Sequence, residues 1–244
     1  MQDGWIEIRI AAIGLSEKDI GADDGLTDVA GIVIKCGMGV TRFRPGDRVY
    51  ALAYSRLNTH VRVPARIAQP MALDDTFNSM ASVPSVFCSA LYALRHIAQL
   101  KKDQRILIQS ATSSLGLAAI QIAKTLEAQI FASVQTCAQA QYLQKDFAIP
   151  EENVFAILQD CGFAEKMLDL TGGKGFDTIF STMADDLNAS IGNCIAPRGY
   201  FIHVGKLSVQ HRRNVALEIL DRNATFSSFD LYSLSTEDLA FCSQ

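Results

Sequence analysis

Hydrophobic and polar positions follow two different rhythms along the chain. Up to about residue 75, short apolar stretches alternate with polar positions and end at Gly or Pro, as over 5–14, 29–37, 44–53 and 59–65. Alternation with a period of two is typical of strands with one buried face. Pro64, in the last stretch, indicates an edge strand or a strand end. These residues predict a small rolled sheet or partial β-barrel.

From about residue 76 the pattern changes to strands that alternate with helices. A helical zone over 77–100, with Pro84 near the start of a helical turn, comes first. Strands are expected over 105–109, 129–134, 153–157, 176–182, 199–205 and 224–231. Helices are expected over 114–126, 137–147, 163–173, 185–196 and 213–221. Such alternation predicts an α/β fold with a doubly wound, Rossmann-like parallel sheet.

Composition and charge narrow the class of protein. The chain has 244 residues, 49% hydrophobic and 20% charged, which is typical of globular proteins. Its formal net charge is −4 and its basic residues are scattered, so we expect neither nucleic acid nor a membrane as a partner. The sequence shows no apolar run of roughly 18 residues, no signal-peptide pattern and no C-x-x-C pair among its six cysteines. We therefore expect reduced thiols, no metal site and a cytoplasmic location.

The stretch QSATSSLGLAAIQIAK, residues 109–124, has the position of a phosphate-binding loop. It follows an apolar strand pattern and opens a helical one, and its small residues let backbone N–H groups approach a pyrophosphate. Its only glycine is Gly116. An ordinary strand-to-helix turn with serine caps would give the same local pattern, so both interpretations stay open.

Longer stretches resemble the enoyl reductase domains of fungal highly reducing polyketide synthases, in the medium-chain dehydrogenase/reductase superfamily. The similar segments are 30–52, with its RPGDRV turn, 81–94, 170–206 and 223–231. The resemblance implies a partial GroES-like β-barrel domain over 1–75, a Rossmann domain over 76–230, and a return toward the first domain over 231–244. It implies NADPH-dependent reduction of an α,β-unsaturated thioester on an acyl carrier protein. It also implies that the β-rich domain is truncated at both ends of the chain.

The resemblance carries a set of functional positions onto this chain. Lys206, at the end of the fifth strand of the Rossmann domain, is the candidate catalytic residue. The implied cofactor-binding residues are Ala111, Thr112, Ser113, Ser114, Leu115, Gly116, Ser133, Gln135, Thr136, Ser181, Thr182, Val204, Gly205 and Lys206.

Two groups of cofactor positions depart from the family pattern. Ser113 and Ser114 replace paired glycines, which weakens the loop only if a glycine there needed a positive φ. Gln139 and Ala140 replace a Lys-Arg pair that would bind the 2′-phosphate of NADPH. Losing two partly exposed cations costs about 1–3 kcal/mol, or roughly tenfold to a hundredfold in affinity.

The implied proton-donor positions depart as well. Asp186 stands where related animal fatty acid synthases have a lysine, and Ser208 stands where an aspartate is usual. An ionised carboxylate is a poor acid at neutral pH, whereas Asp185 and Asp186 would favour the dipole at a helix N-terminus. Among the four histidines, His203 alternates with apolar neighbours and is expected to be half-buried.

These departures leave three functions open. The chain is an enoyl-reductase-like domain with impaired or lost reduction, an active NADPH-dependent enoyl reductase, or a related quinone or alkenal reductase acting on a small-molecule enoyl substrate. Dimeric relatives pair the last strand of the sheet with a second copy. The apolar edge over 224–230 therefore predicts a homodimer.

Overall fold

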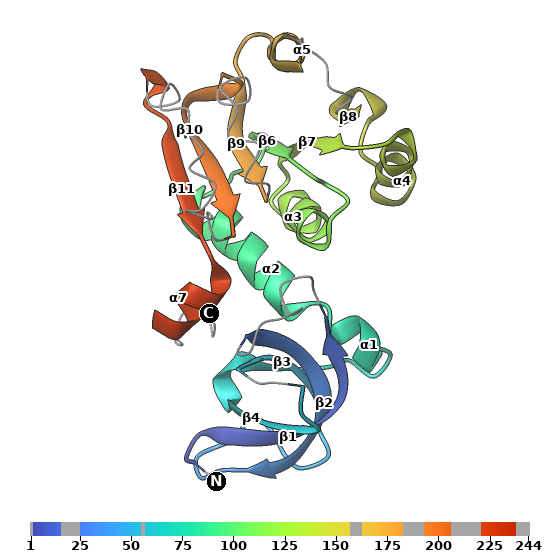
Figure 1. Cartoon of the computed structure of the whole chain (residues 1–244), viewed down its shortest axis with the longest axis vertical. Coiled ribbons are helices and arrows are strands. Elements are labelled where there is room, and N and C mark those ends of the chain that lie inside the picture. Colours follow the sequence, from blue (N-terminus) through green and yellow to red (C-terminus); the bar gives the residue numbers. More distant parts are fainter. Residues whose placement is uncertain are drawn as a thin grey trace. The chain divides into compact units, whose positions relative to one another are not determined.

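The structure, a computed structural model, describes residues 2–15, 25–54, 57–156, 163–182, 193–205 and 221–237 (Figure 1). The chain forms two compact units, one of Met1–Cys88 with Leu231–Gln244 and the other of Ser89–Asp230. Each unit is built around its own β-sheet.

The first unit contains an antiparallel sheet with the strand order β4-β1-β2-β3-β5. Its strands are β1 (Trp5–Gly14), β2 (Leu26–Cys36), β3 (Arg48–Tyr54), β4 (His60–Pro64) and β5 (Ala68–Pro70). Strand β4 lies at one edge and ends at Pro64, as the proline predicts. Strand β5 has three residues, too few for the hydrophobic pattern to predict it. Together the five strands form the rolled sheet that the sequence predicts (Figure 1).

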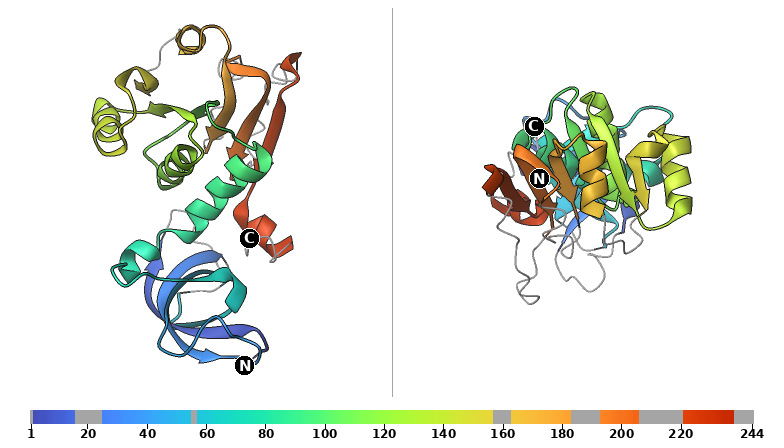
Figure 2. Two further views of the ribbon diagram at one scale, coloured as in Figure 1. Left: turned by 180° about the vertical axis from the view of Figure 1, so that it is seen from behind. Right: turned by 90° about the horizontal axis from the view of Figure 1, so that it is seen from above.

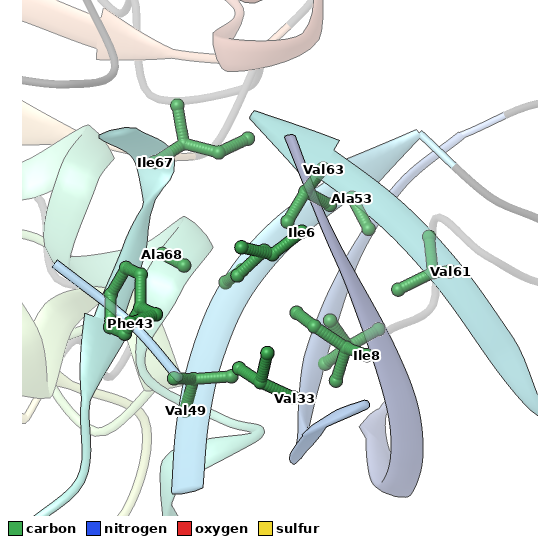
Figure 3. Packing of buried hydrophobic residues seen from close by; sticks show 12 residues of the cluster. Ile6, Ile8, Val33, Phe43, Val49, Ala53, Val61, Val63, Ile67 and Ala68 are labelled. Atoms are coloured by element: carbon green, nitrogen blue, oxygen red, sulfur yellow. The ribbon is translucent and has the colours of Figure 1, made fainter. Parts of the chain in front are cut away.

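One face of this curled sheet carries the core of the first unit. Ile6 and Ile8 alternate along β1 and are fully buried. They lie toward Val33 and Val49 of the neighbouring strands, with Phe43 closing the cluster beside them (Figure 3). Alternate side chains of a strand point to the same face, so the period-two pattern of the sequence becomes one continuous apolar layer.

The RPGDRV turn, residues 44–49, leads into β3, and its Arg48 side chain contacts the segment that follows β5. The backbone N–H of Arg44 donates to a carboxylate oxygen of Asp47 at 2.7 Å, which closes the turn. The guanidinium of Arg48 donates to the carbonyl of Ala72 at 3.2 Å and lies 4.8 Å from the centre of the Phe77 ring. Arginine suits this role because its planar group can donate several hydrogen bonds while it stacks on an aromatic face.

A buried carboxylate ties β2 to the start of a helix. Helix α1 (Phe77–Met80) is followed by α2 (Pro84–Leu91), which begins with its proline at the first helical position. Asp28 is 8% exposed, and its carboxylate accepts hydrogen bonds from the Ser85 backbone N–H at 3.0 Å and from the Ser85 hydroxyl at 2.7 Å. The carboxylate thus satisfies a helix-end donor and interacts favourably with the helix dipole.

The second unit contains a parallel sheet with the strand order β11-β10-β9-β6-β7-β8. Its strands are β6 (Arg105–Ile108), β7 (Gln129–Val134), β8 (Val154–Ala156), β9 (Phe176–Ser181), β10 (Ile195–Val204) and β11 (Thr225–Phe229). Numbered in chain order the strands run 6-5-4-1-2-3, the arrangement of a doubly wound dinucleotide-binding sheet, in which strands are added first on one side of β6 and then, from β9, on the other. The predicted fold class is confirmed.

Helices α3 (Ser114–Thr125), α4 (Cys137–Phe147) and α5 (Phe163–Leu170) connect these strands. Helices α3 and α4 pack beside β6, β7 and β8 (Figure 2). The crossovers through α3 and α4 run in one direction across the sheet, and the crossover through α5 runs in the other. Since such crossovers are right-handed, α5 lies on the opposite face, where Met167 joins the cluster of Leu107 and Ile179.

Three sequence expectations differ from the structure. The helix expected over 185–196 is wrong at its end, because Ile195 and Ala196 already belong to β10. The rest of that helix up to residue 192 and most of the helix expected over 213–221 lie outside the described residues. Leu231 does not end the last strand but begins helix α7 (Leu231–Glu237), in which Tyr232 packs edge to face with Tyr54, 6.0 Å between ring centres.

Strand β11 lies at an edge of the parallel sheet. The predicted homodimer would pair through this edge strand. Pairing with a second copy stays a prediction. In the part of the chain that the structure describes, no helix is both long and apolar enough to cross a bilayer.

The Asp28 carboxylate provides a test of the first unit. Replacing Asp28 by Ala leaves the Ser85 donors without this partner, so we expect the free energy of unfolding to fall by about 1–3 kcal/mol. Urea denaturation of D28A and of D74A, which removes an exposed acid from the same unit, measures the difference. Equal losses in the two variants would contradict the assigned role.

Cys194 provides a test of the second unit. Burial raises the pKa of its thiol to about 11, against the opposing effect of Arg222. Between pH 9 and about 11 the unfolded chain releases this proton while the folded chain retains it, so folding stability falls as the pH rises. We expect C194A to lose part of that decline, measured as the slope of unfolding free energy against pH. Parallel slopes for the two proteins would argue against the raised pKa.

Candidate functional site

The turn after β6 leads directly into helix α3. The backbone N–H of Gln109 donates to the carbonyl of Phe180 at 2.9 Å, and that of Ala111 donates to the carbonyl of Ser133 at 3.0 Å. Ser113 caps the helix, and its hydroxyl oxygen accepts from the Gly116 N–H at 3.0 Å. The loop is therefore held at the carboxyl ends of β6, β7 and β9, where doubly wound folds bind their ligands.

The two serines that replace the family's glycines fit this loop. Ser113 has φ −67° and ψ 159°, and Ser114 is the first residue of α3. Neither residue has a positive φ, whereas Ser110 has φ +49°. The replacement therefore introduces no backbone strain at residues 113 and 114.

Gly116 is required for a close approach. A Cβ atom at this position would lie 2.6 Å from the carbonyl oxygen of Ser110 and 2.7 Å from that of Ala111. The missing side chain lets the first turn of α3 lie against the loop, which is one of the roles that glycine has in dinucleotide-binding turns.

The start of α3 retains free hydrogen-bond donors. The backbone N–H groups of Ser114 and Leu115 make no hydrogen bond within the described ranges. Unpaired donors at a helix N-terminus, together with the helix dipole, favour an anion. The geometry of this turn therefore fits a dinucleotide pyrophosphate.

The turn after β7 is arranged differently. Thr136 caps helix α4, and its hydroxyl oxygen accepts from the Gln139 N–H at 3.2 Å. The side-chain oxygen of Gln139 accepts in return from the backbone N–H of Gln135 at 2.8 Å and of Thr136 at 3.1 Å. This reciprocal arrangement is a capping box. The sequence Thr136-Cys-Ala-Gln139 shows the pattern of such a box, so it could have been recognised before the structure.

This capping box lies where the family resemblance places the 2′-phosphate subsite. The only basic side chain of α4 is Lys145, in its last turn, about 13 Å along the helix from the cap. Gln135 and Thr136 are exposed, and their N–H groups are already paired. The residues present fit the pyrophosphate and do not fit a 2′-phosphate.

The ends of β9 and β10 carry the other expected positions. Ser181 and Val204 are buried, and Thr182 is half-buried. Gly205 has φ +132°, and its N–H donates to the Phe229 carbonyl at 2.8 Å. Lys206, the candidate catalytic residue, lies outside the described residues, as do Asp185, Asp186 and Ser208.

A band of polar side chains crosses the sheet just below this edge. His203 of β10 pairs with Ser181 of β9, and Gln109 and Ser133 directly follow Ile108 and Ala132, which pair between β6 and β7. His203 is 2% exposed, so the expectation that it is half-buried is wrong. Strands on both sides and the covered faces of a parallel sheet explain its burial.

Two members of this band have unmet hydrogen-bonding capacity. Gln109 and Ser133 are 0% exposed, and neither the Gln109 amide atoms nor the Ser133 hydroxyl has a hydrogen-bond partner in the described structure. Buried polar atoms are seldom left unpaired, so these atoms indicate a polar ligand group or ordered water near the edge. A glutamine at the end of the apolar run RILIQ was the sequence signal for this feature, and it was missed.

Comparison with known proteins identifies the class of protein that this fold and edge define. Residues 114–241, more than half of the chain, match the model of the zinc-binding dehydrogenase family, so the chain belongs to that family. Its superfamily, the medium-chain dehydrogenases and reductases, generally binds NAD(P)H. Among the described residues, no three His, Cys, Asp or Glu side chains come together as a possible metal site.

More specific similarity is to fungal polyketide synthases. The chain is 39% identical over 247 residues to prosolanapyrone synthase of Alternaria solani, covering 98% of this chain and 9% of that protein. It is 36% identical over 236 residues to the highly reducing polyketide synthase xilA of Penicillium crustosum, covering 93% of this chain and 9% of that protein. The chain thus spans about a tenth of the length of these relatives. The expected family resemblance is confirmed.

Solved structures share the fold at lower identity. The CurK enoyl reductase has a TM-score of 0.86 and 22% identity, over 99% of this chain and 79% of that chain. The CurF ER cyclopropanase of the curacin A biosynthetic pathway has a TM-score of 0.80 and 20% identity, over 99% and 77%. These similarities support the fold. The chemistry of this chain is inferred from its own residues.

Gly116 provides a test of the loop. In G116A the added Cβ meets two backbone carbonyl oxygens, so we expect the second unit to lose about 1–3 kcal/mol of stability despite the higher helix propensity of alanine. S114A, which changes an exposed residue of the same helical turn, should be close to neutral. Denaturant unfolding of both variants measures the contrast, and a stable G116A would refute the packing role.

Proposed function

We propose that this chain is an enoyl-reductase-like domain of a highly reducing polyketide synthase in which NADPH-dependent reduction is impaired or lost. Its ancestral substrate class is an α,β-unsaturated acyl thioester on an acyl carrier protein, and its location is cytoplasmic. The similarity to fungal synthases supports the domain assignment. The proposal of impairment rests on the turn after β7.

The absence of cations from that turn is the observation that carries the impairment. A 2′-phosphate is a dianion, and it needs positive charge or several donors to offset its desolvation. Gln139 and Ala140 supply no charge, and the Gln139 side-chain oxygen already accepts the backbone N–H groups of Gln135 and Thr136. The 2′-phosphate of NADPH would therefore bind at this turn without a cation to offset its charge.

An active NADPH-dependent enoyl reductase is the second candidate. The loop of Ser113 and Ser114 favours it, since the loop fits a pyrophosphate without strain. In that case Lys206 would be the first residue to test for contact with cofactor or substrate. A quinone or alkenal reductase is the third interpretation, and reduction of a free substrate would distinguish it.

Cofactor binding and turnover separate these functions. We expect calorimetric titration to show no NADPH binding tighter than the millimolar range, and no oxidation of NADPH in the presence of a crotonyl thioester. The CurK enoyl reductase, measured in parallel, serves as the positive control for the thioester assay. Micromolar NADPH binding with thioester reduction would replace the proposal by the active reductase, and reduction of a quinone or free alkenal alone would favour the third interpretation.

A further inference from the structure

We infer that Gln109 is a nicotinamide-binding residue, whose side-chain carboxamide pairs with the carboxamide of a nicotinamide dinucleotide at the carboxyl end of β6. The inference deepens the proposed function and rests on its assignment of a dinucleotide site. It is carried by the place of Gln109 in the parallel sheet and by the unmet hydrogen-bonding capacity of its side chain.

Gln109 stands at the switch point of the parallel sheet, the border between β6 and β9. Strands β7 and β8 are added on one side of β6, and β9, β10 and β11 on the other. In doubly wound folds the ligand binds in the crevice outside the carboxyl ends of the strands at such a point. Gln109 directly follows β6, and its backbone N–H donates to the carbonyl of Phe180 in β9 at 2.9 Å.

A polar layer continues the apolar layer on one face of this sheet. Leu107 and Phe131 belong to one buried cluster, and Gln109 and Ser133 follow them by two positions. Since alternate residues of a strand point to the same face, Gln109 and Ser133 continue the face of that cluster. The same step of two leads from Ile179 to Ser181 and from Phe201 to His203. The covered face therefore changes from apolar to polar toward the edge where a ligand would bind.

The Gln109 carboxamide is the group of this layer with the largest unmet capacity. Its oxygen and its nitrogen are both buried, and neither has a hydrogen-bond partner in the described structure. An amide that makes no hydrogen bond loses none when it turns about its side-chain bonds toward a ligand. Ser110, the next residue, is half-buried, so the amide is close to the edge. A ligand that offers both a donor and an acceptor would relieve the cost of burying the amide unpaired.

The chemistry of the amide favours the nicotinamide end of a dinucleotide. In the doubly wound arrangement the pyrophosphate lies at the helix after the first strand and the adenosine ribose beside the second strand, so the other half extends toward β9. A nicotinamide carboxamide has one carbonyl oxygen and one NH₂ group, which can pair reciprocally with those of Gln109. A thioester carbonyl only accepts, and it would leave the Gln109 oxygen without a donor.

Calorimetry on the full chain with NAD⁺, ADP-ribose and 3-acetylpyridine adenine dinucleotide tests the inference. ADP-ribose lacks the nicotinamide, and the acetylpyridine analogue replaces only the amide NH₂ by a methyl group. NAD⁺ is the probe because it carries no 2′-phosphate. We expect NAD⁺ to bind about fivefold or more tighter than either analogue, since each of them loses hydrogen bonds to Gln109. A ratio below twofold for either analogue would overturn the inference.

Two variants assign the difference to Gln109. Q109M keeps a side chain of similar length without hydrogen-bonding atoms, so the preference of NAD⁺ over each analogue should fall below twofold while ADP-ribose binds as before. Q121M makes the same exchange at an exposed position of α3 and should leave the preference unchanged. A preference that survives in Q109M would overturn the role of Gln109.

Denaturant unfolding of Q109M separates ligand binding from a structural role. Met removes buried polar atoms that have no partner, so we expect Q109M to be at least as stable as the unmodified chain. A destabilised Q109M with an unchanged NAD⁺ preference would assign a structural role to Gln109 and overturn the inference. If Q109M does not fold, the comparison of NAD⁺ with the acetylpyridine analogue on the unmodified chain decides.

The failure of this inference is distinguishable from the failure of the proposed function. No binding of NAD⁺ at millimolar concentration would overturn the inference and leave the proposed loss of reduction intact. Reduction of a crotonyl thioester with NADPH would refute the impaired-reductase proposal, whatever the affinity ratios of NAD⁺ and its analogues.

Discussion

The close approach of helix α3 to the turn after β6 is the contact on which the second unit depends. It requires Gly116, because a Cβ there would lie less than 3 Å from two backbone carbonyl oxygens. With α3 in this position, Ala111 bonds to the end of β7 and Gln109 bonds to the end of β9. These two hydrogen bonds tie the loop to β7 and β9, and Gly116 lets the N-terminus of α3 lie against that loop, where doubly wound folds bind their ligands.

Every helix start has backbone donors that need partners, and side chains of this chain satisfy some of them. At α4 the Thr136 hydroxyl accepts from the Gln139 N–H while the N–H groups of Cys137 and Ala138 have no partner in the described ranges, and at α2 the carboxylate of Asp28 accepts from Ser85. At α3 the Ser113 hydroxyl satisfies one donor, and the N–H groups of Ser114 and Leu115 have no partner in the described ranges. A donor that the fold leaves unpaired is available to a ligand, whereas a donor that the fold has paired must first be released.

The long periodic segments could be predicted closely from the sequence. The strand expected over 129–134 and the helix expected over 137–147 match β7 and α4 at both ends, because pattern and caps agree there. Prediction failed where a partner far along the chain decides the structure. Strand β5 has three residues and forms only beside β3, and Ile195 extends β10 because it pairs with Phe176. At the site, the loop could be located, but the pairing state of its donors and the unpartnered Gln109 needed coordinates.

The residues that depart from the family pattern differ in kind from those that the fold uses. Gly116, Asp28 and Arg48 make packing and hydrogen-bond contacts within the protein, so their loss would cost stability whether or not a nucleotide binds. A cation in place of Gln139 would serve mainly the ligand, and glutamine is the better partner for the helix cap. Under the proposed loss of reduction, phosphate recognition is not required, and the capping box then favours glutamine through stability. The proposal thus accounts for a Rossmann domain with a loop that fits a pyrophosphate and with Gln139 and Ala140 at the positions of the family's Lys-Arg pair.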